Sequence, residues 1–257
     1  MKKKELEKNR NYMIAKRNDL IQKSRYSLSV VEQKIVWLLI SKIEPDDGEF
    51  KKYEFDLHDF CQLCGIQEAN GKNYKNLKSA IDKLTGRSFW MYLNSTYEQQ
   101  IKWIENPAID HEKKVLILQL NPLLKPFLLN LKAQGGYSLL EYPMTLIMQS
   151  KYSIRLYEML KSLSLLGEYT YELNDLKRKI NAEKYERFPD FKRRVLDISM
   201  LEINMFADFL VEAILIKTGR AYTHIKFVFT PKDGIQHYDT SKLIEKRLET
   251  VENQLTF

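Results

Sequence analysis

The sequence predicts an α+β fold in which one domain plan occurs twice. With 257 residues, the chain is long enough for two domains of roughly 100–120 residues. Residues 55–60 (FDLHDF) correspond to residues 171–176 (YELNDL), and the triplet Leu77, Ile81 and Leu84 corresponds, at a nearly equal offset, to Phe191, Val195 and Ile198. Each copy is predicted as long helix, short strand, two helices and a β-hairpin, which is the order of a winged helix. We therefore expect two tandem, pseudo-repeated winged-helix domains.

The domain boundaries are predicted from composition. Residues 1–17 are basic and have little apolar pattern, which favours an N-terminal tail. The only Gly-Gly pair, Gly135-Gly136, is the best linker candidate. The expected division is a tail at 1–17, an N-terminal winged-helix domain at 18–134, a C-terminal winged-helix domain at 135–232 and a C-terminal tail at 233–257. Within the C-terminal tail, a short amphipathic helix is expected near 240–250.

In the first block, Ser29 and Glu32 have the spacing of a capping box and predict the start of a helix. A short strand is expected at Lys51–Phe55, and Asp56 should cap a helix that Gly65 ends. A third helix is expected over 73–85. Three strands rich in aromatic and β-branched residues are expected after it, at 88–93, 99–104 and 115–120.

The second block repeats this order. Ser150 precedes a helix of apolar residues at helical spacing, and a short strand follows at 169–171. Of the next two helices, the second is expected at 189–200 with Phe191, Val195 and Ile198 facing the core. Two strands, at roughly 208–217 and 222–230, close the block around a turn that contains Gly219.

The charge of the chain favours an anionic partner. The formal net charge is +7 and the pI is about 9.1, and basic side chains outnumber acidic ones between residues 177 and 194. On the helix at 189–200, Arg193 faces away from the predicted core and is the best candidate to read a base, since arginine can make a bidentate contact with guanine. Lys192, Arg194 and Arg187 are better placed for phosphates.

Further DNA contacts are expected from the hairpin tip and from the first domain. Lys217 and Arg220 lie at the predicted tip, and His224 and Lys226 lie on the strand after it. The matching helix of the first domain should offer phosphate contacts through Lys75, Lys78, Ser79, Lys83 and Arg87. The apolar strands of this domain, which include Trp90 and Tyr92, exceed what a wing needs, so we expect most of these residues in the core and some at a dimer face.

Other chemistry finds little support in the sequence. Cys61 and Cys64 have C-x-x-C spacing, but no second cysteine pair or His pair would complete a zinc site. We expect both cysteines to be small core residues, and we expect no cofactor, no metal and no catalytic residue. No membrane span and no signal peptide are predicted, and two cysteines suit a reducing compartment, so a soluble cytoplasmic protein is expected.

Three segments resemble one protein family. Residues 25–36 (RYSLSVVEQKIV), 152–161 (YSIRLYEMLK) and 217–229 (KTGRAYTHIKFVF) look like the initiator Rep proteins of iteron-containing plasmids. The resemblance covers about residues 18–231. It implies two tandem winged-helix domains that bind short direct repeats, called iterons, in double-stranded origin DNA as a monomer.

The resemblance also implies partners and regulation. In this family the N-terminal domain dimerises, and the dimer represses the rep gene at an inverted repeat. The host initiator and the replicative helicase are the usual protein partners. Two alternatives stay open: a dedicated dimeric winged-helix repressor, and an enzyme such as a DNA nickase or primase.

Overall fold

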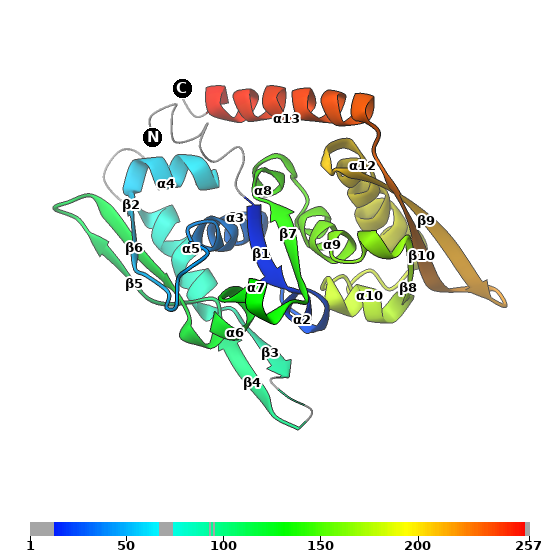
Figure 1. The fold of residues 1–257 in the computed structure, drawn as a ribbon, viewed down its shortest axis with the longest axis horizontal. Helices are drawn as coiled ribbons and strands as arrows, with labels where there is room; N and C mark the ends of the chain where they lie inside the picture. The colour runs from blue at the N-terminus through cyan, green and yellow to red at the C-terminus, as the bar shows by residue number, and fades with distance from the viewer. Residues whose placement is uncertain (1–12, 67–73, 93, 95, 255–257) are drawn as a thin grey trace.

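The computed structural model describes residues 13–66, 74–92, 94 and 96–254 (Figure 1). Two α+β units lie beside each other, with β1 and β7 between them. The first unit consists of α3 (Val30–Ile40), β2 (Tyr53–Asp56), α4 (Leu57–Cys64), α5 (Lys75–Gly86), β3 (Ser88–Tyr92), β4 (Glu98–Lys102), β5 (Ile104–Asp110) and β6 (Val115–Leu120). The second consists of α9 (Lys151–Lys161), β8 (Glu168–Glu172), α10 (Leu173–Lys179), α11 (Phe188–Phe191), α12 (Asp197–Phe206), β9 (Phe209–Thr218) and β10 (Ala221–Pro231).

Both units contain a three-stranded antiparallel sheet of the same topology. The strand order is β2-β6-β5 in the first unit and β8-β10-β9 in the second. In each, the short strand after the first helix pairs with the last strand of the hairpin. This shared topology is that of a winged helix and confirms the predicted pseudo-repeat.

Local signals in the sequence fix several helix ends. The Ser29 hydroxyl accepts the Glu32 N–H at 3.3 Å, while the Glu32 carboxylate accepts the Ser29 N–H at 2.7 Å, so the capping box is present. Asp56 accepts the N–H three residues further on at 3.0 Å, and Gly65 ends α4 in the left-handed conformation, with φ at +69°. Ser150 caps α9 in the same manner as Asp56 caps α4.

The expected strand at 99–104 is two strands in the structure. β4 pairs with β3 as a separate hairpin, whereas β5 begins at Ile104 and pairs with β6. Asn106 has a positive φ of 45°, and the register of β5 against β6 shifts between Glu105 and Ala108. This bulge accommodates Pro107, which a regular ladder would not. The proline and the bulge interrupt the alternation of side chains, so β5 was not predicted as a separate strand.

The segment expected as a basic tail is partly structured. Residues 1–12 lie outside the described residues, but residues 13–17 form β1 (Met13–Arg17), which pairs with β7 (Tyr137–Glu141), and α2 (Asn18–Lys23) follows directly. The expected tail therefore does not extend to residue 17. Residues 13–17 form a strand instead, because alternate side chains, Ile14 and Lys16, are buried there. The Gly135-Gly136 pair leads directly into β7, so strand pairing joins the residues on either side of it.

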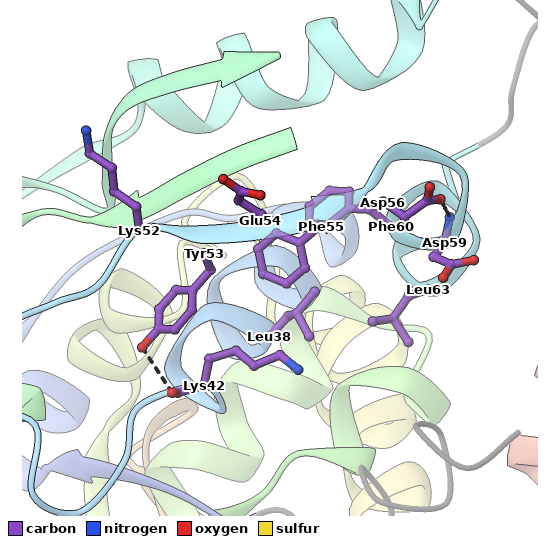
Figure 2. A pocket seen from close by; sticks show the side chains of 10 residues that line it. All are labelled: Leu38, Lys42, Lys52, Tyr53, Glu54, Phe55, Asp56, Asp59, Phe60 and Leu63. Atoms are coloured by element: carbon purple, nitrogen blue, oxygen red, sulfur yellow. Dashed lines mark hydrogen bonds between the residues drawn. The ribbon is translucent and has the colours of Figure 1, made fainter. Parts of the chain in front are cut away.

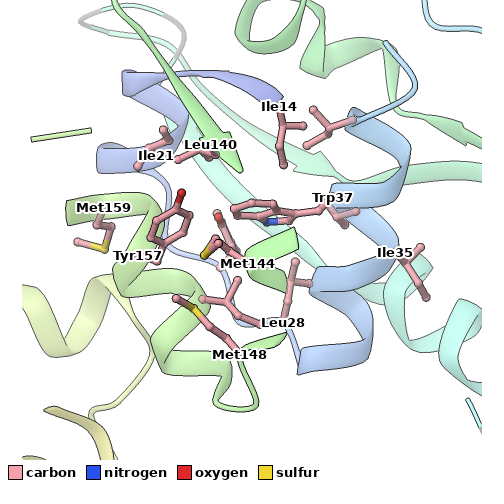
Figure 3. Close-up of a cluster of buried hydrophobic side chains, with 14 of the residues drawn as sticks. Ile14, Ile21, Leu28, Ile35, Trp37, Leu140, Met144, Met148, Tyr157 and Met159 are labelled. Atoms are coloured by element: carbon pink, nitrogen blue, oxygen red, sulfur yellow. The ribbon is translucent and has the colours of Figure 1, made fainter. Parts of the chain in front are cut away.

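A single core extends through both units (Figure 3). The rings of Trp37 on α3 and Tyr157 on α9 are 6.3 Å apart, and Ile14 and Leu140 meet across the β1–β7 pair. Full burial of such side chains stabilises a fold by about 1.5–3 kcal/mol each. The connection between the units also contains η1 (Pro122–Leu124), α6 (Lys125–Leu128), α7 (Leu131–Gln134) and α8 (Pro143–Ile147), whereas η2 (Ser164–Leu166) follows α9 within the second unit.

A cluster of charged side chains is buried within this core. The Glu158 carboxylate on α9 accepts hydrogen bonds from Lys16 of β1, from the Tyr26 hydroxyl at 2.5 Å and from Arg155 Nη1 at 2.9 Å. The other terminal nitrogen of Arg155 donates to the carbonyls of Ile21 and Ser24. The cluster therefore fastens the N-terminal strand and α2 to the first helix of the second unit.

The segment expected as a C-terminal tail, residues 233–257, contains a long helix. This helix, α13 (Gly234–Gln254), passes over α8 and α12 along the top of the view in Figure 1. The buried ammonium of Lys232 donates to the Thr240 hydroxyl at 2.8 Å and fixes the turn into the helix. The sequence suggested only a short amphipathic helix near 240–250, because the polar composition of the segment concealed its packing.

Candidate nucleic-acid interface

The helix expected to read DNA is longer than predicted and contains an irregular turn. It begins with α11, continues through a π-helical turn at Lys192–Leu196 and ends with α12 at Phe206. A π turn contains an additional residue, so it rotates the helix face that all later residues present. Single π turns inside α-helices often occur at functional sites, and this one contains three of the predicted DNA contacts.

The rotation changes which residues face the core. Phe191 and Val195 are buried as predicted, but Ile198 is 42% exposed. Ser199 and Ile203 take the inward positions instead. The prediction for Ile198 is wrong because it assumed an uninterrupted period of 3.6 residues through the π turn.

The three basic residues of the π turn lie at the surface, and two of them have acidic neighbours. The Arg193 side chain is 72% exposed, and its guanidinium lies 3.5 Å from the Asp190 carboxylate. Lys192 Nζ is 2.7 Å from the Asp197 carboxylate, and Arg194 is exposed. Exposed ion pairs of this kind contribute only about 0–1 kcal/mol. A phosphate or a base edge can therefore replace the carboxylates at little cost.

Stacked aromatic rings bring the wing next to this helix. Gly219 adopts a φ of +63° at the tip of the β9–β10 hairpin, as the tight turn requires. Lys217 Nζ lies 4.6 Å from the centroid of the Tyr222 ring, which stacks on Phe188 with ring centroids 4.0 Å apart. Phe188 is the first residue of α11, so one stack connects the wing tip to the start of the reading helix. Neither aromatic residue was predicted from the sequence to be part of the site. Only their nearness to basic residues along the chain indicated such a role.

The remaining predicted residues of the second domain differ in their surroundings. Arg187 at the N-cap of α11 and Arg220 at the wing tip are exposed. His224 is partly buried, and its Nδ1 lies 3.0 Å from the neighbouring Thr223 hydroxyl. Lys226 forms an ion pair with Glu168 of β8 at 2.6 Å. Both His224 and Lys226 thus lie on the sheet and have local partners, whereas Arg187 and Arg220 are open to a ligand.

The first domain presents its basic residues on α5. Leu77, Ile81 and Leu84 are buried as predicted, and the opposite face exposes Lys75, Lys78, Ser79 and Lys83. Arg87 lies just after the helix and pairs with Glu32 at 3.3 Å. The Glu32 carboxylate also completes the capping box of α3. Arg87 therefore has a structural partner, and a DNA phosphate would share its guanidinium with Glu32.

A hollow beside β2 contains none of the predicted contact residues (Figure 2). It has a volume of about 570 Å³, and Figure 2 shows the apolar side chains Leu38, Phe55 and Leu63 close together in it. The Tyr53 hydroxyl donates to the Lys42 carbonyl at 3.0 Å and closes one end.

The two cysteines lie inside the first domain. Cys61 and Cys64 are both buried on α4, and burial raises the pKa of the Cys64 thiol. Within the described ranges, no three His, Cys, Asp or Glu side chains come together as metal ligands would. No helix in the described part of the chain combines the length and apolar character needed to span a bilayer.

Comparison with known proteins identifies the family. A family model described as "Initiator Replication protein, WH1" matches residues 13–161, and one described as "Initiator Rep protein, WH2" matches residues 172–229.

One solved structure shares the fold, and a second is a more distant match. The crystal structure of Pi initiator protein in complex with iteron DNA is 20% identical in sequence, with a TM-score of 0.68 over 87% of this chain and 99% of that chain. The crystal structure of domains 2 and 3 of RctB is 13% identical, with a TM-score of 0.47 over 81% of this chain and 85% of that chain. Together, the repeated winged-helix topology and the two family models, which cover most of the sequence, show that this chain belongs to the initiator replication protein family.

Proposed function

We propose that this chain initiates plasmid replication by binding iterons, short direct repeats in double-stranded origin DNA. The observation that carries the proposal is the basic surface of the second domain, where the π turn at Lys192–Leu196 lies next to the wing tip at Lys217–Arg220. A helix fits the major groove, and a hairpin tip can grip the backbone beside it. The Pi initiator protein, whose fold this chain shares, was crystallised with iteron DNA.

Each group of residues has a separate role in this proposal. Arg193 reads a base, while Lys192, Arg194 and Arg187 contact phosphates. Lys217 and Arg220 hold the backbone at the wing, with His224 and Lys226 as weaker contributors because of their local partners. In the first domain, α5 contacts phosphates at the other end of the repeat through Lys75, Lys78, Ser79 and Lys83, with a shared contribution from Arg87.

The proposed mechanism is binding without covalent chemistry. Monomers on adjacent iterons deform the duplex and help to melt a nearby A·T-rich region, because DNA bending is sensitive to sequence and costs only a few kcal/mol. A monomer–dimer equilibrium through the N-terminal domain would allow the dimer to repress the chain's own gene. The host initiator and the replicative helicase are the proposed protein partners at the opened origin.

Footprinting on the DNA around the chain's own gene tests the proposal first. Protection of tandem direct repeats is expected, whereas protection of a single inverted repeat alone would favour the dedicated repressor. Incubation of supercoiled origin DNA with this protein and Mg²⁺ or Mn²⁺ should leave the DNA intact. A nick, or a protein–DNA adduct through tyrosine, would favour an enzyme.

A substitution at Arg193 tests the reading helix. Arg193→Ala should lower the affinity for the protected repeat by roughly 1–3 kcal/mol for each lost base contact, while affinity for random DNA changes little. Lys132→Ala removes the same charge from an exposed site on α7 and serves as the control. An unchanged ratio of specific to random binding in the Arg193 variant would refute the assignment of this helix.

A further inference from the structure

An apolar row extends along the outer face of α12. Ile198, Leu201 and Met205 are separated by three and four residues, so they lie on one face of the helix. Their exposed fractions are 42%, 63% and 41%. Scattered exposed apolar residues need no explanation, but a contiguous set usually marks an interaction site.

The C-terminal helix extends this row into a groove. Leu201 and Met205 line a groove of about 420 Å³ together with Leu243 of α13 and Ile147 of α8, and the polar residues Gln149, Glu202 and Lys246 also line it. Leu243 is itself 46% exposed. The groove therefore presents apolar side chains from three helices and could receive aromatic or aliphatic side chains from another chain.

The position of the row limits its occupant. Arg194 lies about one turn before Ile198, so the row continues the helix face that begins with the proposed DNA contacts. A partner that binds the row must itself lie along the duplex. On tandem repeats, the next copy of this chain also lies along the same duplex, so it is the occupant that the proposed function offers.

Direct repeats also determine the kind of interface. Neighbouring copies have the same orientation along the DNA, so their contact must be heterologous and must join two different patches. The structure has a second exposed apolar patch on the β3–β4 hairpin, where Trp90, Tyr92 and Tyr97 are each more than half exposed. Figure 1 shows α12 and α13 at the top of the molecule and this hairpin projecting from the bottom.

We propose that the α12–α13 row of one copy binds the β3–β4 hairpin of the next copy on the adjacent repeat. The inference rests on the proposed binding of tandem repeats. It gives a role to the β3–β4 hairpin and to α13, neither of which takes part in the proposed DNA contacts. Head-to-tail contacts would then make the second binding event tighter than the first.

Titration of DNA with one repeat and with two repeats tests the contact. The wild-type chain should bind the second repeat about 5- to 150-fold more tightly than the first, the usual range for coupled sites. Leu201→Asp and Trp90→Ala should each abolish this gain and leave the affinity for one repeat unchanged. Leu165→Asp, at a fully exposed leucine of η2, is the matched control and should retain the gain.

Mixing the two variants decides between a heterologous contact and a symmetric one. An equal mixture of Leu201→Asp and Trp90→Ala on two-repeat DNA should recover part of the gain, because one order of the two chains keeps both patches intact. No recovery, together with loss of self-association without DNA in the Trp90 variant alone, would show that the hairpin joins a symmetric dimer and would overturn the proposal.

Two other outcomes count against the inference and separate it from the proposed function. Absence of any gain in the wild-type chain, or an equal gain in the Leu201 and Leu165 variants, overturns the contact while iteron binding stands. Failure of the wild-type chain to bind even one repeat removes the proposed function itself. Thermal unfolding of each variant checks that its fold is intact.

Discussion

Replacing Glu158 by glutamine should destabilise the folded chain by about 3–5 kcal/mol. The side chains of Glu158 and Lys16 are each 1% exposed, and Arg155 is 4% exposed. Glutamine keeps nearly the same shape, but it removes the only carboxylate that neutralises these two cations in the described hydrogen-bond cluster. The loss is large because a buried charge without its partner keeps its desolvation cost.

Thermal unfolding followed by circular dichroism measures this effect. For a chain of this size, 1 kcal/mol changes the Tm by about 2–4 °C, so the Glu158→Gln variant should melt about 6–20 °C lower. Glu112→Gln, at an exposed position in the β5–β6 turn, is the matched control and should change the Tm by little. Equal Tm values for the two variants would refute the argument that the ion cluster fastens β1 to α9.

The same cluster predicts a dependence on pH. Burial by itself would raise the pKa of Glu158, but the attraction of Lys16 and Arg155 and the hydrogen bonds to the carboxylate outweigh it and hold the pKa below its ordinary value of 4.5. The folded pKa is thus depressed, so this stabilisation is present above the unfolded pKa and is lost as the pH falls through the folded pKa. Below about pH 4.5, the Tm of the wild-type chain should fall more steeply than that of the variant. If the Tm of the two chains fell in parallel as the pH was lowered, the depressed pKa of Glu158 would be contradicted.

Three further predictions concern the site and the core. Tyr222→Ala removes the stack between the wing and the reading helix, so electrophoretic mobility shifts should show weaker binding to specific and random DNA alike; a changed ratio would contradict this role. Ile203→Ala should lower the free energy of unfolding in urea by about 2–5 kcal/mol, and Ile198→Ala by about 0.5 kcal/mol or less; the reverse order would mean that the π turn is absent. Cys61 and Cys64 should react with a thiol reagent only after guanidinium is added, because both are buried, and rapid labelling of the native chain would refute their burial.

Local signals in the sequence were sufficient for much of the fold. The Ser29–Glu32 capping box, the Asp56 cap and the Gly65 terminator act within a few residues, so their effect on helix ends can be predicted without the rest of the chain. The repeat was also visible, because each copy must bury an equivalent apolar face. The exposed cations of α5 and of the reading helix followed from the same periodicity, since residues opposite a buried face lie at the surface.

Other features depended on contacts between distant residues. β1 is a strand because β7 pairs with it, and Lys16 is buried because Glu158 lies opposite. The bulge at Pro107 and the length of α13 likewise depend on the surfaces against which they pack. The residues of α13 indicated only part of that helix, and no regular pattern indicated β1 or the bulge.

The sequence by itself determined the two winged-helix units, their order and the basic residues on their surface, because short-range capping and apolar periodicity are encoded in neighbouring residues. Only the tertiary structure decided the phase of the reading helix after its π turn, the stack that joins Phe188 to Tyr222 and the core shared by both units. The reason is physical: a helix face is oriented by what it packs against, and these partners lie far away in the chain.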